Sequence, residues 1–411
     1  MHAENSLSNS KNILINLTDQ NSSDANLNYL LTHFCGTTTT CAADITCVND
    51  AQRIYVIGDL AKLDSCFNEH VELLVIKEFS LNIEPISNAT LTTISHGQVP
   101  LNIHNAGVYY RKLFSDESDY FSKIKTEHDF QQLTESNKPS TALRKGIYIS
   151  KVTQTHANSD DEQLHFHLLR CSSNLTGATD NLRETDHHVV NVVNEAAKYD
   201  FTQPTDLNHV LAQIYENKAK DENNPKDVKA KIKAHSDKTK DMPKAGLIAF
   251  CTFYENSKFA ELTPSKTDTF DWCYKKSSAL TRLIFKLKPS VTDESLVKEF
   301  TVTLYPNSVF IIPLSTNRLY THEIRPSVLN IDKIPIRMGY VIRCSNLEAV
   351  YTNDKTFIKE NDELIEMKNI NDENMLDLRD AYYKENKYQS HVDYGTVHFS
   401  MNSGDYKKPI L

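Results

Sequence analysis

The sequence predicts a mainly β protein with some helix (α+β), built as a sandwich or a barrel. Short runs of apolar, β-branched and aromatic residues recur along the chain, and polar loops separate them. Few of the intervening segments have helical periodicity, which argues against alternating β-α units. Hydrophobic residues make up 39% of the 411 residues and charged residues 24%, so a buried core can form and wholesale disorder is excluded.

The first 105 residues are expected to form an N-terminal extension. Residues 1–30 are rich in Asn, Ser and Asp, which bury too little apolar surface to order a chain, so this part is expected to be a mobile tail. Two short apolar runs, at 53–58 and 71–76, indicate strands of a small module that ends near Asn105. No residue of this module points to a function.

The main domain is expected at residues 106–352. A strand-like run at 108–114 opens it, and Ser115, followed by two acidic residues, fits the N-cap of a helix that includes Tyr120, Phe121 and Ile124. Six further strands are expected, at 147–152, 165–169, 247–254, 280–287, 308–314 and 336–344.

The sequence also excludes several classes of protein. The ten glycines form neither a dinucleotide-binding fingerprint nor a phosphate-binding loop, which argues against nucleotide-fold enzymes. The N-terminus has no basic segment followed by an apolar one, and no run approaches the roughly 18 apolar residues of a membrane helix. Eight cysteines are too dilute for a disulfide scaffold. A cytoplasmic or nuclear protein, neither secreted nor membrane-bound, is therefore expected.

Two charge blocks interrupt this chain, whose net charge is −9. Residues 218–244 contain nine lysines against five acidic residues, and residues 348–380 contain ten acidic residues against four basic ones. Charge runs are usually solvated surface. The simplest expectation is therefore a solvated loop at 218–244 and a solvated or disordered tail within an acidic C-terminal extension at 353–411.

A set of His and Asp residues points to a metal site. His235 and Asp237 are two positions apart, so they face the same side if they lie in or at the end of a strand. His322, 85 residues after Asp237, offers a second imidazole. Two His and one carboxylate leave three positions open on an octahedral ion, the arrangement of non-haem Fe(II) oxygenases. A second H-x-D triplet, at His391 and Asp393, has no Arg after it and is expected to be peripheral.

Two arginines follow on a predicted strand. Arg337, Gly339, Val341 and Arg343 share one face of residues 336–344, and the opposite face is apolar. In isolation such arginines fit a solvent-exposed face, but a Gly between them often marks close approach of a ligand. The distal carboxylate of 2-oxoglutarate, a co-substrate of such oxygenases, needs a bidentate cation that stays charged when buried. Arg337 is the candidate for that role.

Together these motifs resemble the Fe(II)/2-oxoglutarate dioxygenases of the AlkB type. The resemblance extends from Gly107 to about Tyr351 and depends on four segments, at 208–215, 235–237, 317–322 and 337–343. It implies a double-stranded β-helix (jelly-roll) core with flanking helices, between the N- and C-terminal extensions. It also implies an oxidoreductase that couples decarboxylation of 2-oxoglutarate to succinate and CO2 with oxidation of a second substrate.

The resemblance assigns roles to individual residues. It makes His235, Asp237 and His322 the Fe(II) ligands and Arg337 the partner of the distal carboxylate of 2-oxoglutarate. Tyr215 would hydrogen-bond the same co-substrate. Arg343 would lie nearer the metal, or would hold the acidic ligand and the substrate.

The substrate is less specified than the metal centre. The family resemblance favours demethylation or hydroxylation of a nucleic-acid base, and the lysine-rich loop from Lys218 to Lys244, next to the H-x-D motif, is expected to contact DNA or RNA phosphates. There are two alternatives: a same-fold hydroxylase of a protein side chain or small molecule, and a binding domain without turnover.

Four aromatic residues could stack on a base or simply pack in the core; they are Tyr109, Tyr110, Tyr148 and Phe166. The polar segment 174–186, which carries a turn Gly, is a candidate for a substrate-facing loop. Neither the sequence nor the resemblance indicates an oligomeric state.

Overall fold

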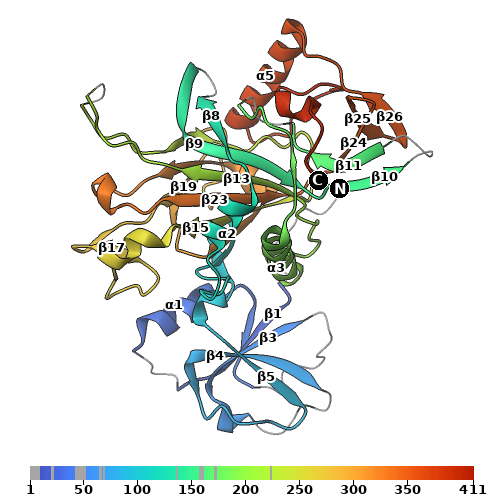
Figure 1. Cartoon of the computed structure of the whole chain (residues 1–411). Coiled ribbons are helices and arrows are strands. Elements are labelled where there is room, and N and C mark those ends of the chain that lie inside the picture. Colours follow the sequence, from blue (N-terminus) through green and yellow to red (C-terminus); the bar gives the residue numbers. More distant parts are fainter. Residues whose placement is uncertain are drawn as a thin grey trace.

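The protein is mostly β, as the sequence predicts, and carries helices on its outer faces (Figure 1). The computed structural model describes residues 10–19, 23–41, 52–63, 67, 70–135, 138–156, 162–170, 174–222 and 225–411. Within these residues no helix is both long and apolar enough to cross a membrane.

Two antiparallel sheets pack face to face and form the centre of the molecule. The larger has nine strands, whose order is β12 (Asp180–Asn181), β9 (Lys138–Ser150), β13 (His209–Tyr215), β23 (Arg337–Arg343), β15 (Leu247–Tyr254), β21 (Ser308–Pro313), β7 (Gly107–Tyr110) and β6 (Leu101–Ile103), with β8 (Gln131–Glu135) paired to β9. In this sheet β12 alone pairs in parallel, with β9. The smaller sheet has the order β14 (Ile232–His235), β22 (Tyr320–Arg325), β19 (Arg282–Leu287) and β20 (Glu299–Thr303).

Because side chains alternate between the two faces of a strand, each of these sheets directs apolar side chains into the space between them. Phe250 and Phe310 of the larger sheet and Phe285 and Phe300 of the smaller one belong to a single buried cluster. The rings of Phe285 and Phe300 stack with centroids 4.8 Å apart. Because one face of each sheet is apolar, the two faces bury each other, and any polar side chain that points between them is withdrawn from water.

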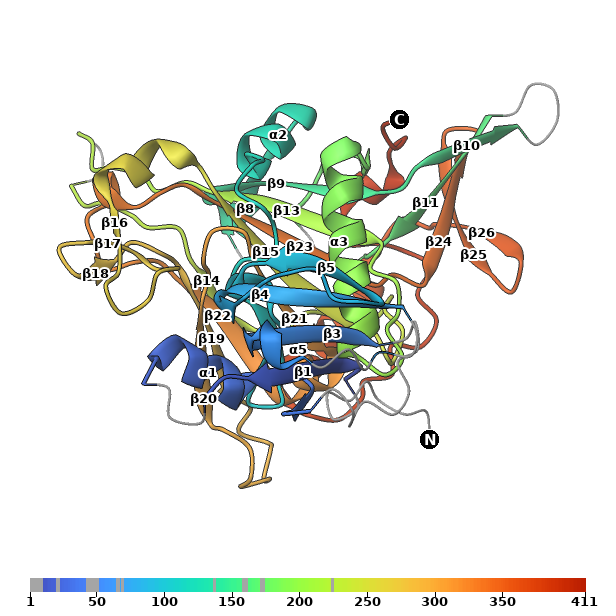
Figure 2. The same ribbon diagram turned by 90° about the horizontal axis from the view of Figure 1, so that it is seen from below.

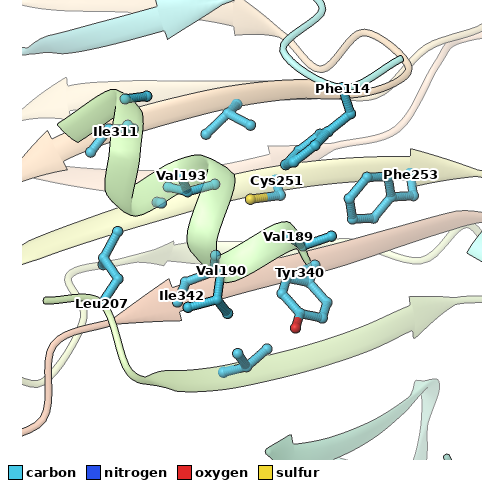
Figure 3. Packing of buried hydrophobic residues seen from close by; sticks show 14 of the residues in the cluster. Phe114, Val189, Val190, Val193, Leu207, Cys251, Phe253, Ile311, Tyr340 and Ile342 are labelled. Atoms are coloured by element: carbon cyan, nitrogen blue, oxygen red, sulfur yellow. The ribbon is translucent and has the colours of Figure 1, made fainter. Parts of the chain in front are cut away.

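Two helices cover the outer face of the larger sheet. They are α2 (Tyr120–Glu127) and α3 (Glu184–Asp200). Val189, Val190 and Val193 of α3 lie over strand residues such as Tyr340 and Ile342 (Figure 3). Strand β23 alternates as predicted, because Met338, Tyr340, Ile342 and Cys344 all lie in this outer cluster.

Two expectations about this region are wrong. The cap of α2 is Asp119, whose carboxylate accepts the backbone N–H of Ser122 at 3.0 Å, and not Ser115. The end of the segment 174–186 is not a substrate-facing loop, because residues 183–186 form the N-cap and first turn of α3 and Asp186 is fully buried.

A buried polar network joins α2, α3 and β23. The ring of His128 bonds through Nδ1 to Asp180 (2.8 Å) and through Nε2 to Asp186 (2.7 Å). Asp186 also accepts the hydroxyl of Tyr340 at 2.8 Å and the backbone N–H of Arg183. Burial opposes the protonated imidazole, but the hydrogen bonds and charges of the two carboxylates outweigh it and raise the pKa of His128 to about 9.

The charge of His128 should make stability depend on pH. Since the pKa of His128 is raised above its ordinary value of 6.5, its stabilisation is fully present below about pH 6.5 and is lost as pH rises through about 9. The shift corresponds to about 3 kcal/mol. We expect the difference in unfolding free energy between the native protein and His128→Gln, measured by urea denaturation, to shrink between pH 7 and pH 10. A constant difference across this range would mean that His128 is uncharged in the folded protein.

The N-terminal region forms a separate parallel sheet. The expectation of a mobile tail at residues 1–30 is wrong for residues 12–17 and 25–30, which form a strand and part of a helix, and residues 1–9 and 20–22 lie outside the described residues. Its order is β2 (Thr37–Thr39), β1 (Asn12–Leu17), β3 (Arg53–Asp59), β4 (Val71–Leu81) and β5 (Ala89–Ile94), with helix α1 (Ala25–His33) against it. Figures 1 and 2 show this sheet beside α3. Asn12 donates to the buried carboxylate of Asp200 at 2.9 Å, and Tyr110 donates to the same carboxylate. Strand β1 (NILINL) is itself mostly apolar, although residues 1–30 as a whole are rich in Asn, Ser and Asp, and these contacts and its pairing with β2 and β3 hold it in place.

The C-terminal residues are folded, contrary to the expectation of a solvated or disordered tail. Strands β25 (Lys355–Glu360) and β26 (Glu363–Glu366) extend a sheet that contains β10 (Thr153–His156), β11 (Glu162–Leu168) and β24 (Leu347–Thr352). Helix α5 (Asp372–Lys387) then packs on the central domain. The remaining elements are the short helix α4 (Leu314–Leu319) and the small sheet of β16 (Thr263–Pro264), β17 (Trp272–Tyr274) and β18 (Ser277–Ser278).

Candidate metal centre

The structure brings His235, Asp237 and His322 together between the two central sheets. His235 is the last residue of β14, and strand pairing places it directly opposite His322 of β22. The two imidazole rings lie with centroids 4.5 Å apart. Asp237 follows two residues after His235, so its carboxylate reaches the same point as both rings.

The distances suit a single ion. Oδ1 of Asp237 lies 3.6 Å from Nε2 of His235 and 3.8 Å from Nε2 of His322. One ligand atom from each residue lies within 4.8 Å of the others. Ligand bonds of about 2 Å to a common ion produce separations close to these. Two imidazoles and one carboxylate are also the donor set that leaves part of an octahedral ion open.

The charges at this cluster are set by burial and by Arg343. Burial alone would raise the pKa of Asp237, but Arg343 and the two imidazoles hold it well below its usual range. Nε of Arg343 donates to Oδ2 of Asp237 at 2.8 Å, which leaves Oδ1 facing the imidazoles. Burial lowers the pKa of His322 to about 3. At neutral pH the site therefore offers an ionised carboxylate and a neutral imidazole, the forms that bind metals.

Asn317 belongs to this site, although no sequence pattern indicates a role for it. Its side chain accepts the backbone N–H of Asp237 and donates to the backbone carbonyl of Asp237, both at 2.8 Å. The side chain of Ser236 donates to the carbonyl of Tyr320 at 3.1 Å. These bonds tie the H-x-D segment to α4 and β22. Asn317 stands within the motif at 317–322, but only the folded chain places it against Asp237.

Arg337 lies six residues before Arg343, on the same face of β23. Its side chain is buried, and its guanidinium stacks on the ring of Tyr215 at 3.9 Å. Among the described residues, Nε and Nη2 of Arg337 have no hydrogen-bond partner. A buried guanidinium without an acceptor is costly, so the arrangement fits an anionic ligand that is held by this group.

Gly339 allows this arrangement. A Cβ atom at this position would stand 2.9 Å from Nη1 of Arg337 and 3.2 Å from the ring of Tyr215. Tyr215 donates its hydroxyl to Oε1 of Gln213 at 3.0 Å. A cavity of about 10 Å³ borders Arg337 and Tyr215, enough for about one water, so a larger anion requires the lining side chains to move.

The other candidate residues lie elsewhere. His391 and Asp393 are exposed in the C-terminal segment, as expected of a peripheral pair. Tyr109 and Tyr110 are buried in the two central clusters, and Phe166 is buried in the C-terminal sheet. Core packing therefore accounts for these three aromatic side chains. Tyr148 is also buried, with its ring against His209.

The lysines of the lysine-rich loop include some that bind other groups of the protein and others that are exposed. Lys240 is buried in an ion pair with Asp241, and Lys229 donates to the carbonyl of Ser327, so the expectation of phosphate contacts along the whole loop is wrong for Lys240. Six lysines of the loop are exposed: Lys218, Lys220, Lys226, Lys231, Lys233 and Lys244.

A second group of metal-binding residue types converges at Glu127, His128 and Asp186. Here both ring nitrogens of His128 are already engaged by carboxylates, so the imidazole has no lone pair to offer a metal. In the cluster of His235, Asp237 and His322, by contrast, Oδ1 of Asp237 lies 3.6 and 3.8 Å from the two Nε2 atoms, beyond hydrogen-bond distance.

Comparisons with known proteins give little further information. No family model matches the chain, and no curated protein matches it. Among solved structures, that of OsALKBH1 is similar, with a TM-score of 0.35 and 11% sequence identity, over 60% of this chain and 99% of that chain. The fold and the site define a mainly β protein with a cluster of two histidines and one aspartate, of which Asp237 and His322 are buried and His235 is partly exposed.

Proposed function

We propose that the chain is an AlkB-like Fe(II)- and 2-oxoglutarate-dependent dioxygenase, with a double-stranded β-helix core within residues 106–352. The observation that carries the proposal is the pairing of two features between the same sheets. His235, Asp237 and His322 converge on one point, and Arg337, on the strand that also holds Arg343, is buried with no hydrogen-bond partner for its Nε and Nη2 among the described residues. A metal site alone would not require a buried guanidinium whose Nε and Nη2 have no hydrogen-bond acceptor among the described residues.

The residues divide the chemistry between them. His235, Asp237 and His322 would hold Fe(II), and Arg343 keeps Asp237 ionised and oriented. The chemistry that Fe(II) supplies when bound is the coupling of 2-oxoglutarate decarboxylation to the insertion of one oxygen atom into a C–H bond. Arg337 would bind the distal carboxylate of 2-oxoglutarate in a bidentate contact, and Tyr215 fixes the guanidinium by stacking. The apolar walls around His322, which include Phe250 and Phe285, exclude water.

We infer that the oxidised substrate is a nucleic-acid base. The exposed Lys231 and Lys233 of the lysine-rich loop lie four and two residues before His235, a proposed ligand and the last residue of β14. Phosphate contacts by such lysines would orient a strand. The alternative is a hydroxylase of a protein side chain or of a small molecule, which would make no use of these charges.

The test is turnover. The full chain is incubated with Fe(II), 2-oxoglutarate and oxygen, and with methylated DNA and RNA oligonucleotides or a peptide mixture. Succinate is measured together with the mass of each substrate. We expect succinate formation and loss of a methyl group, or gain of one oxygen atom, in an oligonucleotide. Oxidation of peptides alone would support the alternative, and absence of succinate under all conditions would refute the dioxygenase proposal.

The lysine-rich loop gives a separate prediction. Replacing the exposed Lys226, Lys231 and Lys233 with Gln should weaken binding to a nucleic acid and flatten the slope of log affinity against log salt by about 2 to 3, since each lost phosphate contact contributes about 0.7 to 0.9. Uncoupled decarboxylation of 2-oxoglutarate should be unchanged. The matched control replaces the exposed Lys355 and Lys359 of β25 with Gln. Equal slopes for the two variants would exclude the loop as the nucleic-acid contact.

A further inference from the structure

The loop that contains Asp237 is held by the C-terminal part of the chain. We define the ligand loop as residues 236–241, which follow His235 directly. We propose that Asn386 and Glu385, in the last turn of α5, are positioning residues of the metal centre. The proposal rests on the metal-binding role of His235, Asp237 and His322 inferred above.

Asn386 contacts the loop between the two metal-binding side chains. Its Oδ1 accepts the backbone N–H of Ser236 at 2.7 Å. Its Nδ2 donates to the carbonyl of Tyr382 at 3.0 Å, which fixes the rotamer so that Oδ1 points at the loop. Because Ser236 joins His235 to Asp237, a displacement of this peptide moves both side chains. The same peptide segment has no strand pairing beyond His235 to hold it.

Glu385 holds the loop two residues further on. Its carboxylate accepts the backbone N–H of Thr239, at 3.1 Å to Oε1, and also the hydroxyls of Thr239 and Tyr394. The backbone carbonyl of Glu385 accepts the ammonium of the buried Lys288 at 2.7 Å. Glu385 is itself buried, so these donors replace water around it. The last turn of α5 is thus fixed on one side by Lys288, and on the other side it accepts hydrogen bonds from the ligand loop.

A third contact holds the last residue of the ligand loop, Asp241. Arg170 binds the carboxylate of Asp241 through Nε and Nη2, at 3.2 and 2.8 Å, and donates through Nη1 to the carbonyls of Val397 and Phe399. Tyr382 of α5 donates its hydroxyl to the carbonyl of Arg170 at 3.1 Å. Residues 382–399 therefore contact the ligand loop at its beginning and middle, and through Arg170 at its end. Side chains that orient metal ligands in this way set the geometry and affinity of a site.

The experiment measures binding of Mn(II) alone to the full chain, by the electron paramagnetic resonance signal of free Mn(II). It also records the visible absorption of bound Co(II), which reports coordination geometry. Asn386→Leu removes the acceptor at nearly constant size, and Asn386→Asp retains it. Asn374→Leu, at the opposite end of α5, is the matched control. We expect Asn386→Leu to weaken Mn(II) binding about 10- to 100-fold and to change the Co(II) spectrum, because residues that orient ligands have effects of this size. Asn386→Asp should restore most of the affinity.

The outcomes separate this inference from the proposed function. If the native chain binds no Mn(II), the metal centre itself is refuted. If the native chain binds Mn(II) and Asn386→Leu matches Asn374→Leu in affinity and Co(II) spectrum, the positioning role is overturned and the metal centre stands. Circular dichroism checks the fold of each variant. Should Asn386→Leu fail to fold, Glu385→Gln, which removes one carboxylate acceptor of the Thr239 and Tyr394 donors, decides the question by the same two measurements.

Discussion

Asp237→Asn is expected to abolish metal-dependent formation of succinate and to remove high-affinity binding of Mn(II). The substitution deletes the negative charge of the cluster and replaces a carboxylate, a good ligand for such ions, with a neutral amide. Loss of Mn(II) affinity should exceed the 10- to 100-fold that is typical of residues that only orient a ligand. Titration calorimetry with Mn(II) and an assay for succinate measure the two effects.

The amide is chosen because Arg343 is buried against Asp237. Removing the whole side chain would leave that guanidinium uncompensated, at a cost of about 3–5 kcal/mol. An amide oxygen still accepts from Nε of Arg343, so the variant should fold. Asp393→Asn, in the exposed second H-x-D triplet, is the control and should keep native affinity and turnover. Equal behaviour of the two variants would remove Asp237 from the metal site.

Strands and their faces could be predicted from the sequence where the signal is local. The run at 247–254 coincides with β15, and the alternation at 336–344 places Arg337 and Arg343 on the face opposite the apolar cluster. The spacing of His235 and Asp237 likewise predicts that they share a site. In each case residues close together in the sequence contain all the information that is needed.

The features that sequence patterns do not predict depend on partners that are distant in the sequence. Asp186 resembles part of a polar loop in the sequence, yet it is buried in the first turn of α3, because His128 and Tyr340, 58 and 154 residues away, satisfy its carboxylate. Glu385 and Asn386 stand in an acidic, polar stretch that composition alone assigns to solvent. They are fixed because the ligand loop, about 150 residues earlier, presents backbone N–H groups to them. Charge counts cannot reveal such pairings.

Arg337→Met is expected to weaken binding of 2-oxoglutarate by about 30- to several thousand-fold. A buried, hydrogen-bonded charge pair loses about 2–5 kcal/mol when one partner is truncated, and each 1.4 kcal/mol is tenfold in affinity. Met keeps much of the apolar contact with Tyr215 but offers no donor. Affinity is measured by calorimetry, without oxygen and with Mn(II) bound, so that only the co-substrate contact changes.

The stability of the same variant tests whether Arg337 serves a ligand rather than the fold. Nε and Nη2 of Arg337 have no partner among the described residues, so Arg337→Met should not lower the thermal midpoint of the ligand-free protein. At 100 times its dissociation constant, 2-oxoglutarate should stabilise the native chain by about 2.7 kcal/mol and should have little effect on the variant. Gly339→Ala, whose Cβ would crowd Nη1, should show a smaller loss of affinity in the same direction. Strong destabilisation of ligand-free Arg337→Met, with unchanged affinity for 2-oxoglutarate, would instead assign Arg337 to the core of the fold.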